Sequence, residues 1–243
     1  MEKRQLSFLD RNPILKDALS LVFFVVCVIL GTLIVNNFIF RSYNVIGISM
    51  ENTFKDGDRV IVNRLTVSMS HFAGQEYIPN RGQIIVFANG STSGPLTCGA
   101  EAGIADQYVI KRVVGFPGER VTVKDGVLTV YNDEHPDGFH PDDETRVSDE
   151  DGPKAFTAGE VDTIVPAGEL FVAGDNREGT HSNDSRYKLG TIPYCRVVGP
   201  VMLRLFPLNK LRFFAEIPKI DLLETTADTL NLSAGTNLVI KRD

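Results

Sequence analysis

The sequence predicts a mostly β domain, built from several short strands, that follows one N-terminal transmembrane α-helix. Two observations support this fold class. Residues 18–40 contain no charged side chain, and their number matches the roughly 20 apolar residues that cross the hydrocarbon core of a bilayer. From residue 41 onward, short runs rich in Val and Ile alternate with Gly, Pro and Asp, which is typical of strands joined by turns.

A cleavable signal peptide is the main alternative reading of the apolar run. Such a peptide has an apolar region of about 7–15 residues that ends in a small-residue cleavage site. The run is longer here and its last residues, 36–41, read NNFIFR, so we expect a retained single-pass anchor in the cell membrane. The Lys and Arg residues among residues 1–17 favour a cytoplasmic N-terminus, although Arg41 weakens this bias. Residues 41–243 then form the extracytoplasmic β domain.

Local patterns predict several elements of this domain. Lys124-Asp125-Gly126 between two Val-rich runs indicates a hairpin, because Asp-Gly suits the positive φ angles of a two-residue turn. An acidic insertion covers about residues 132–160, and a second surface insertion covers residues 89–105. His135 and His140 in the acidic insertion match no recognised metal-ligand spacing, so we expect a solvated loop and no metal site.

Composition narrows the possible functions. The formal net charge of −6 argues against broad nucleic-acid binding, which needs a basic face to neutralise phosphates. Cys98 and Cys195 lie in the outer domain, where an oxidising compartment permits a disulfide, but two buried thiols explain them equally well.

Ser49 is the first candidate for chemistry. It lies nine residues after the apolar run, a tether that spans only about 30 Å when fully extended. A serine at this position therefore stays close to the bilayer surface. Taken alone, a serine that follows a Gly-Ile pair is most often structural.

Lys111 makes a catalytic serine plausible. It lies in the strand-like run of residues 108–115, YVIKRVVG, with apolar neighbours on both sides. Most such lysines point to solvent, but one that points inward loses hydration, and its pKa falls. Only the neutral amine can accept a proton from a serine hydroxyl, and at the ordinary pKa about one lysine in a few thousand is neutral at pH 7.

A third polar cluster follows a predicted strand and covers residues 174–186, GDNREGTHSNDSR. Its carboxylates and guanidinium groups are those of Asp175, Arg177, Asp184 and Arg186. They could form a buried network that supports a site, or a turn with surface ion pairs of little energetic value.

Together these segments resemble the bacterial type I signal peptidase family, the Ser/Lys-dyad serine proteases with a single membrane anchor. The resemblance covers residues 47–53 (GISMENT), 81–87 (RGQIIVF), 111–119 (KRVVGFPGE) and 174–186, in the family's order. Each segment is a weak signal alone. Four of them in order behind an N-terminal anchor make a specific one.

The resemblance implies a membrane-bound endopeptidase that removes N-terminal signal peptides from exported preproteins. Ser49 corresponds to the acylating serine, Lys111 to the general base, and Ser182 to a serine whose hydroxyl orients the lysine amine. Asp184 and Arg186 correspond to a structural ion pair, with Asp175 and Arg177 in support. The resemblance also implies small pockets for alanine-like side chains, at positions that include Val45, Ile46, Met50, Val109 and Ile110. It implies no cofactor, and no partner beyond preproteins and membrane lipid.

The chain departs from the family pattern near the site. The oxyanion region comprises Gly47 and the backbone N–H of Ser49, and Gly47 replaces the serine that supplies a second donor in some relatives. Asn52 stands where the family usually has Pro, and the loop from Arg177 to Ser182 is about two residues longer than usual. Thr180 and Ser185 therefore remain alternatives to Ser182.

Other functions remain open at this stage. A Ser-His-Asp protease is possible because four histidines are available, and His181 lies close to Asp184 in sequence. A non-catalytic or degenerate anchored adaptor would need neither Ser49 nor Lys111. A self-cleaving repressor-type peptidase is disfavoured by the membrane run.

Overall fold

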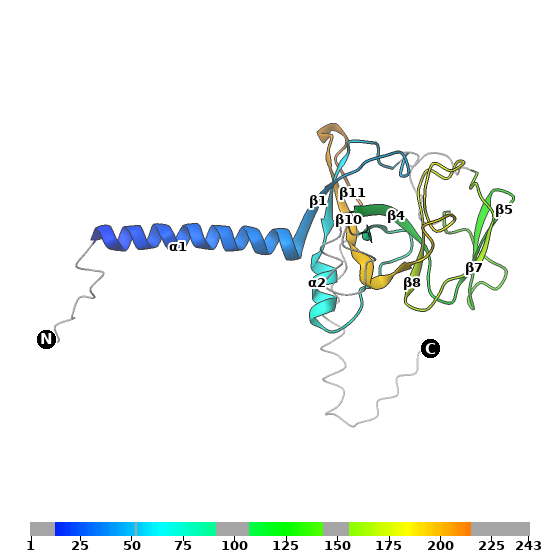
Figure 1. Ribbon diagram of the computed structural model, residues 1–243, viewed down its shortest axis with the longest axis horizontal. Coiled ribbons are helices and arrows are strands. Elements are labelled where there is room, and N and C mark those ends of the chain that lie inside the picture. Colours follow the sequence, from blue (N-terminus) through cyan, green and yellow to red (C-terminus); the bar gives the residue numbers. More distant parts are fainter. Residues whose placement is uncertain (1–12, 52, 91–106, 143–155, 215–243) are drawn as a thin grey trace, which may run out of the picture.

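The computed structural model describes residues 13–51, 53–90, 107–142 and 156–214. A long helix extends away from a β domain, as Figure 1 shows. This helix, α1, covers Pro13–Ile34 and continues into a π-helical turn, η2, over Val35–Ile39. Pro13 suits the first helical position because an N–H group there would have no intrahelical acceptor, so nothing is lost when proline lacks one.

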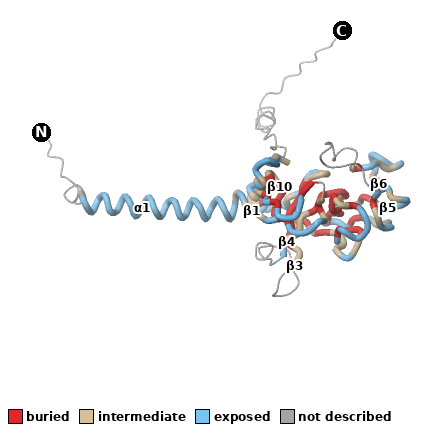
Figure 2. The backbone as a smooth tube through the Cα atoms, turned by 90° about the horizontal axis from the view of Figure 1, so that it is seen from above, coloured by how far each residue is buried: buried red, intermediate tan, exposed pale blue. Residues whose placement is uncertain are grey.

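The helix is long and apolar enough to cross a membrane. The apolar stretch covers Ile14–Ile39, and none of it is buried against the described part of the protein. The residues from Ile14 to Ile34 are all exposed, and Figure 2 shows this part of the backbone in pale blue. A helix that is apolar on all sides has no stable place in water, so this one fits membrane anchoring.

The β domain begins without a linker. Strand β1 starts at Phe40, directly after η2 ends at Ile39, and it pairs with β2 in antiparallel register. Short helix α2, Leu65–Phe72, follows β2 and returns to the end of the anchor, where the Ser68 hydroxyl donates to the Phe38 carbonyl at 3.0 Å.

Two sheets make up the described β domain, which confirms the mostly β prediction. An eight-stranded sheet has the order β1-β2-β10-β3-β4-β8-β9, with β11 on the edge of β10, and a three-stranded sheet has the order β6-β5-β7. The strands are β1 Phe40–Asn44, β2 Arg59–Asn63, β3 Ile84–Gly90, β4 Gln107–Gly115, β5 Arg120–Lys124, β6 Val127–Tyr131, β7 Val161–Ile164, β8 Glu169–Ala173, β9 Ile192–Pro193, β10 Val197–Phe206 and β11 Arg212–Phe213, with short 3₁₀ turns η5 at Tyr194–Arg196 and η6 at Leu208–Lys210.

The hairpin predicted at Asp125-Gly126 is confirmed. Strands β5 and β6 pair in antiparallel register on either side of these two residues. Asp125 has φ +52° and Gly126 has φ +80°, the positive values that a two-residue turn of this kind requires.

The core contains β-branched and aromatic side chains from both sheets. One group lies between β1, β2 and β10 and includes Met50 and Phe54, and a second surrounds β8 and β9. A third joins the three-stranded sheet to β4 and β8 through Val114 and Phe171. Strand β4 is therefore packed on both faces, which places the polar side chains in its middle in a dry environment.

Two of the three cysteines, Cys195 and Cys27, differ in their covalent state. Cys195 forms a disulfide, and Cys27 within α1 is a free thiol. Cys98 and most of the second surface insertion lie outside the described residues.

Candidate active site

Ser49 and Lys111 are brought together by the fold. Ser49 lies in a turn after β1 that is closed by hydrogen bonds from Glu51 N–H to the Ile48 carbonyl and from Phe54 N–H to the Met50 carbonyl. Lys111 lies in β4, 62 positions later in the chain. Its Nζ donates to Ser49 Oγ at 2.7 Å and to the Ile110 carbonyl at 3.0 Å.

The amine of Lys111 is almost completely removed from solvent. The residue is only 3% exposed. Burial lowers the pKa of Lys111 to about 8, against smaller opposing effects of the Asp184 and Asp175 carboxylates. Desolvation disfavours the ammonium form, so far more molecules carry a neutral amine near neutral pH than for an exposed lysine.

Asp184 and Arg186 form the predicted ion pair. Arg186 Nε donates to Oδ1 of Asp184 and its Nη2 to Oδ2, both at 2.9 Å, and neither side chain is exposed. Burial raises the pKa of Asp184, but the hydrogen bonds and the positive charge of Arg186 outweigh burial and lower it. The carboxylate also accepts the Gly174 N–H at 2.8 Å, so it fixes the start of the loop after β8.

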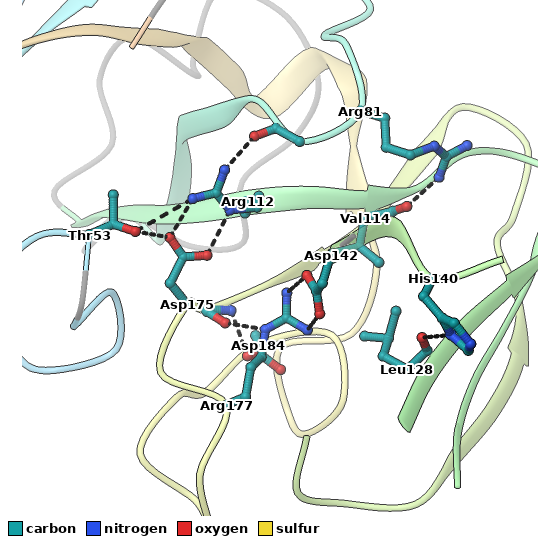
Figure 3. Close-up of polar contacts among 12 residues, drawn as sticks. Thr53, Arg81, Arg112, Val114, Leu128, His140, Asp142, Asp175, Arg177 and Asp184 are labelled. Atoms are coloured by element: carbon teal, nitrogen blue, oxygen red, sulfur yellow. Dashed lines mark hydrogen bonds and ion pairs between the residues drawn. The ribbon is translucent and has the colours of Figure 1, made fainter. Parts of the chain in front are cut away.

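Asp175 is anchored by two residues that the sequence analysis did not identify. Arg112 Nε donates to Oδ1 at 2.7 Å and its Nη2 to Oδ2 at 2.6 Å, while the Thr53 hydroxyl donates to Oδ2 at 2.5 Å. Burial acts to raise the pKa of Asp175, but the charge and hydrogen bonds of Arg112, with the hydrogen bond of Thr53, lower it to about 2. The network in Figure 3 thus ties the residues after Ser49 to β4 and to the loop after β8.

Arg177 is also buried, but its partner comes from the acidic insertion. Its Nη1 and Nη2 donate to the two oxygens of Asp142 at 2.9 and 2.8 Å, and its Nε donates to the Gly174 carbonyl at 2.6 Å. The prediction of a solvated loop is wrong for Asp142, because a fully buried guanidinium group requires a nearby counterion. Residues 143–155 of the same insertion lie outside the described residues.

Ser182 lies beside the dyad without contacting the amine. Its hydroxyl is completely buried and forms no hydrogen bond in the structure, although it is close enough to Asp184 to help lower the pKa of that carboxyl. A Cβ atom on Gly174 would collide with this hydroxyl and with the Ser49 carbonyl, so only Gly fits between the two serines. Of the alternatives, Ser185 donates to the Gly190 carbonyl at 2.7 Å, and Thr180 is exposed.

The backbone N–H groups of the two predicted oxyanion residues, Gly47 and Ser49, differ in their hydrogen bonding. Gly47, at φ +93°, donates its N–H to the Asp56 carboxylate at 2.7 Å, so this group is already engaged. The Ser49 N–H donates to no acceptor among the described residues. Asn176 supports the same turn, because its N–H donates to the Ser49 carbonyl and its Nδ2 to the Ile48 carbonyl, both at 3.1 Å.

A cavity of about 480 Å³ opens next to Ser49 and Lys111. Four of the five predicted pocket positions line it: Val45, Ile46, Val109 and Ile110. The fifth prediction, Met50, is wrong. This side chain is completely buried, packs in the core group with Phe54 and Val60, and does not line the cavity. Further lining residues that the sequence analysis did not assign to the pocket are Tyr43, Tyr108, His181 and Asn183.

The histidines do not form a second catalytic arrangement in the described residues. His181 lines the cavity and is exposed, but its ring makes no hydrogen bond to a serine or a carboxylate there. His140 contacts the Leu128 carbonyl at 3.2 Å in the outer hairpin. Within the described ranges, no cluster of His, Cys, Asp and Glu side chains has a metal-binding arrangement.

Known proteins match most of the chain. The family described as "Signal peptidase, peptidase S26" matches residues 15–206. Signal peptidase I T of Bacillus subtilis (strain 168) is 31% identical over 188 residues, which cover 77% of this chain and 85% of the relative. Signal peptidase IB of Staphylococcus aureus (strain MRSA252) is 32% identical over 191 residues, which cover 74% and 85% of the two chains.

A solved signal peptidase I from Enterococcus faecalis V583 is 25% identical and aligns with 52% of this chain and 98% of its own, at a TM-score of 0.34. That score is too low to support an argument from the structural likeness. The assignment therefore rests on the family match and on the relatives in sequence, and the chain belongs to the signal peptidase family, peptidase S26.

Proposed function

We propose that Ser49 is the nucleophile and Lys111 the general base with which this protein cleaves signal peptides from preproteins. The chain is a serine endopeptidase of the signal peptidase I group and acts on preproteins that carry a signal peptide. The assignment of the two residues is carried by one observation, the 2.7 Å contact between Ser49 Oγ and a lysine amine that is almost completely desolvated.

The reaction follows from this contact. Neutral Lys111 accepts the Ser49 proton while Oγ attacks the carbonyl carbon of the scissile peptide bond. The resulting ammonium group donates its proton to the leaving amine, and an acyl-enzyme remains. Lys111 then accepts a proton from the water molecule that attacks the ester and returns it to Ser49 Oγ as the C–Oγ bond breaks, which restores both residues and releases the mature protein. The Ser49 N–H, which has no described acceptor, is available to the oxyanion.

Ser182 is a positioning residue in this proposal. Its hydroxyl and the Ser49 carbonyl both border the space that a Cβ atom on Gly174 would occupy, and the hydroxyl has no hydrogen-bond partner among the described residues. In this proposal a rotation of the Ser182 side chain brings its hydroxyl to the amine of Lys111 when the proton is transferred. The ion pair of Asp175 with Arg112 holds this loop against β4, and the ion pair of Asp184 with Arg186 fixes the loop internally while the charge on Lys111 changes.

The substrate would bind as an added strand. Strand β4 pairs with β8 only from Arg112 onward, so Val109 and Ile110 have no strand partner on that side among the described residues. An extended peptide can pair with their backbone and reach Ser49. The branched side chains of Val45, Ile46, Val109 and Ile110 narrow the cavity, which favours small residues before the cleaved bond.

Helix α1 would anchor the protein in a single pass, with the N-terminus in the cytoplasm and the β domain outside. The basic residues before the helix support this orientation. The chemistry as proposed requires no cofactor, and its partners are preproteins and membrane lipid.

Separate Ser49→Ala and Lys111→Ala variants test the assignment on a signal-peptide substrate in detergent. Each should lose nearly all turnover, while a Lys124→Ala variant, which removes an exposed lysine from β5, should retain it. Normal turnover in either dyad variant would contradict the assignment. A His181→Ala variant checks the histidine alternative: near-complete loss would favour that mechanism over the lysine mechanism.

A further inference from the structure

A second cavity, of about 550 Å³, lies between the residues that follow Ser49 and the connection from β10 to β11. Its lining includes four basic residues and no acidic one: Lys55, Arg204, Lys210 and Arg212. The catalytic mechanism uses none of these cations. A cavity whose charged lining residues are all cationic favours an anionic ligand.

Arg204 forms the buried part of this cavity. Its side chain is 9% exposed, and it is held by hydrogen bonds from Nε to the Lys210 carbonyl at 2.7 Å and from Nη1 to the Thr53 carbonyl at 2.8 Å. The described residues offer no hydrogen-bond acceptor to Nη2. A fixed guanidinium group with an uncommitted N–H edge is a preorganised donor for a phosphate oxygen.

Arg204 shares its one nearby described carboxylate with a backbone N–H group. Asp58 approaches Arg204 to 3.7 Å, but the same carboxylate also accepts the Lys55 backbone N–H at 3.0 Å. The ammonium groups of Lys55 and Lys210 are exposed and form no ion pair with a described carboxylate. Both can therefore reach a ligand at the mouth of the cavity.

The surroundings of the cavity are apolar on the side of the membrane anchor. Phe206, Leu208, Leu211 and Phe213 are 56%, 71%, 49% and 67% exposed, and Leu211 also lines the cavity. Figure 1 shows this connection, in orange, and α2 on either side of the point where α1 enters the domain. Exposed apolar side chains next to lysines, level with the end of a membrane helix, are the pattern of a lipid interface.

We propose that this cavity binds the phosphate group of an anionic phospholipid. Arg204 would donate to the phosphate oxygens, Lys55 and Lys210 would contact the headgroup from the rim, and Phe206 and Leu208 would enter the acyl region. The proposal rests on the membrane anchoring proposed above. It assigns the β10–β11 connection a role separate from catalysis, because this site shares no residue with the catalytic cavity.

A single tryptophan at position 208 provides the probe, since the chain has none. The full-length Leu208→Trp protein in neutral detergent is titrated with short-chain phosphatidylglycerol, and separately with short-chain phosphatidylcholine and inorganic phosphate. We expect a saturable blue shift with phosphatidylglycerol that weakens with salt. Lys55→Ala and Lys210→Ala should each weaken binding about five-fold. Lys124→Ala, which removes an exposed lysine from the other sheet, should not.

Each other outcome overturns the proposal. Equal responses to phosphatidylglycerol and phosphatidylcholine would show apolar adsorption, and tight binding of inorganic phosphate alone would show a site for a soluble anion. Equal losses in Lys210→Ala and Lys124→Ala would show a general charge effect. Flotation of the protein with neutral vesicles tests the membrane anchor alone, and cleavage of a soluble peptide tests the Ser49–Lys111 dyad alone. Failure of the anchor or of the dyad is therefore distinguishable from failure of the lipid site.

Discussion

The pH dependence of peptide cleavage tests the desolvation of Lys111 most directly. If only the neutral amine accepts the Ser49 proton, kcat/KM follows the fraction of free enzyme in which Lys111 is neutral. With a pKa of about 8, roughly one molecule in eleven is in this form at pH 7. With the ordinary value of 10.5, the fraction is about one in three thousand. Burial thus raises the fraction of neutral Lys111 at pH 7 by about 300-fold.

The assay is the hydrolysis of a signal-peptide substrate from pH 6 to 10 at fixed detergent and ionic strength. The logarithm of kcat/KM should rise with unit slope at low pH and level off above about pH 8. The substrate should have no group that titrates in this range, so that the pH profile reports only groups of the enzyme. A profile that continues to rise ten-fold per pH unit through pH 10 would refute a desolvated base, even if Lys111→Ala is inactive.

Two further predictions concern stability. The folded-state pKa of Lys111 lies below its unfolded value, so burial of the charged form is destabilising below about pH 8, and this effect disappears as the pH rises toward 10.5. In urea titrations, Lys111→Met should therefore raise the free energy of unfolding by about 3 kcal/mol at pH 7, but hardly at all at pH 10.5. An equal gain at both pH values would contradict this reasoning. Arg112→Met, which leaves a buried carboxylate without its main counterion, should lower the free energy of unfolding by about 3–5 kcal/mol. The exposed pair of Arg120 is the control, and Arg120→Met should change stability little, so comparable losses in the two variants would refute the argument from burial.

Local sequence patterns predicted the elements that depend on neighbouring residues. The anchor follows from the length of the apolar run, which matches the thickness of the hydrocarbon core. The β5–β6 turn follows from Asp125-Gly126, because these two residues tolerate the positive φ angles that the turn requires. The proximity of Ser49 and Lys111 is different. The two residues are 62 positions apart, and only the four-segment resemblance placed them together before the structure showed the 2.7 Å contact.

The support of the site was harder to predict. Arg112 follows Lys111 on β4, so the two side chains point to opposite faces, and nothing in the sequence shows that both faces are buried. An arginine within an apolar strand was the available signal. Asp142 had no such signal, because it is one of many carboxylates in an acidic stretch. Only the structure shows that it is the one that pairs with the buried guanidinium group of Arg177.

The direct passage from η2 into β1 has a consequence for how the enzyme selects a cleavage point. Because Phe40 belongs to a paired strand immediately after the membrane helix ends, the β domain has no tether on which to rise or tilt. If α1 spans the membrane as proposed, the anchor and β1 together set the height of Ser49 above the bilayer. We therefore expect a preprotein to be cut where the number of residues between its own apolar segment and the scissile bond matches that height, which would make distance along the membrane normal part of the specificity.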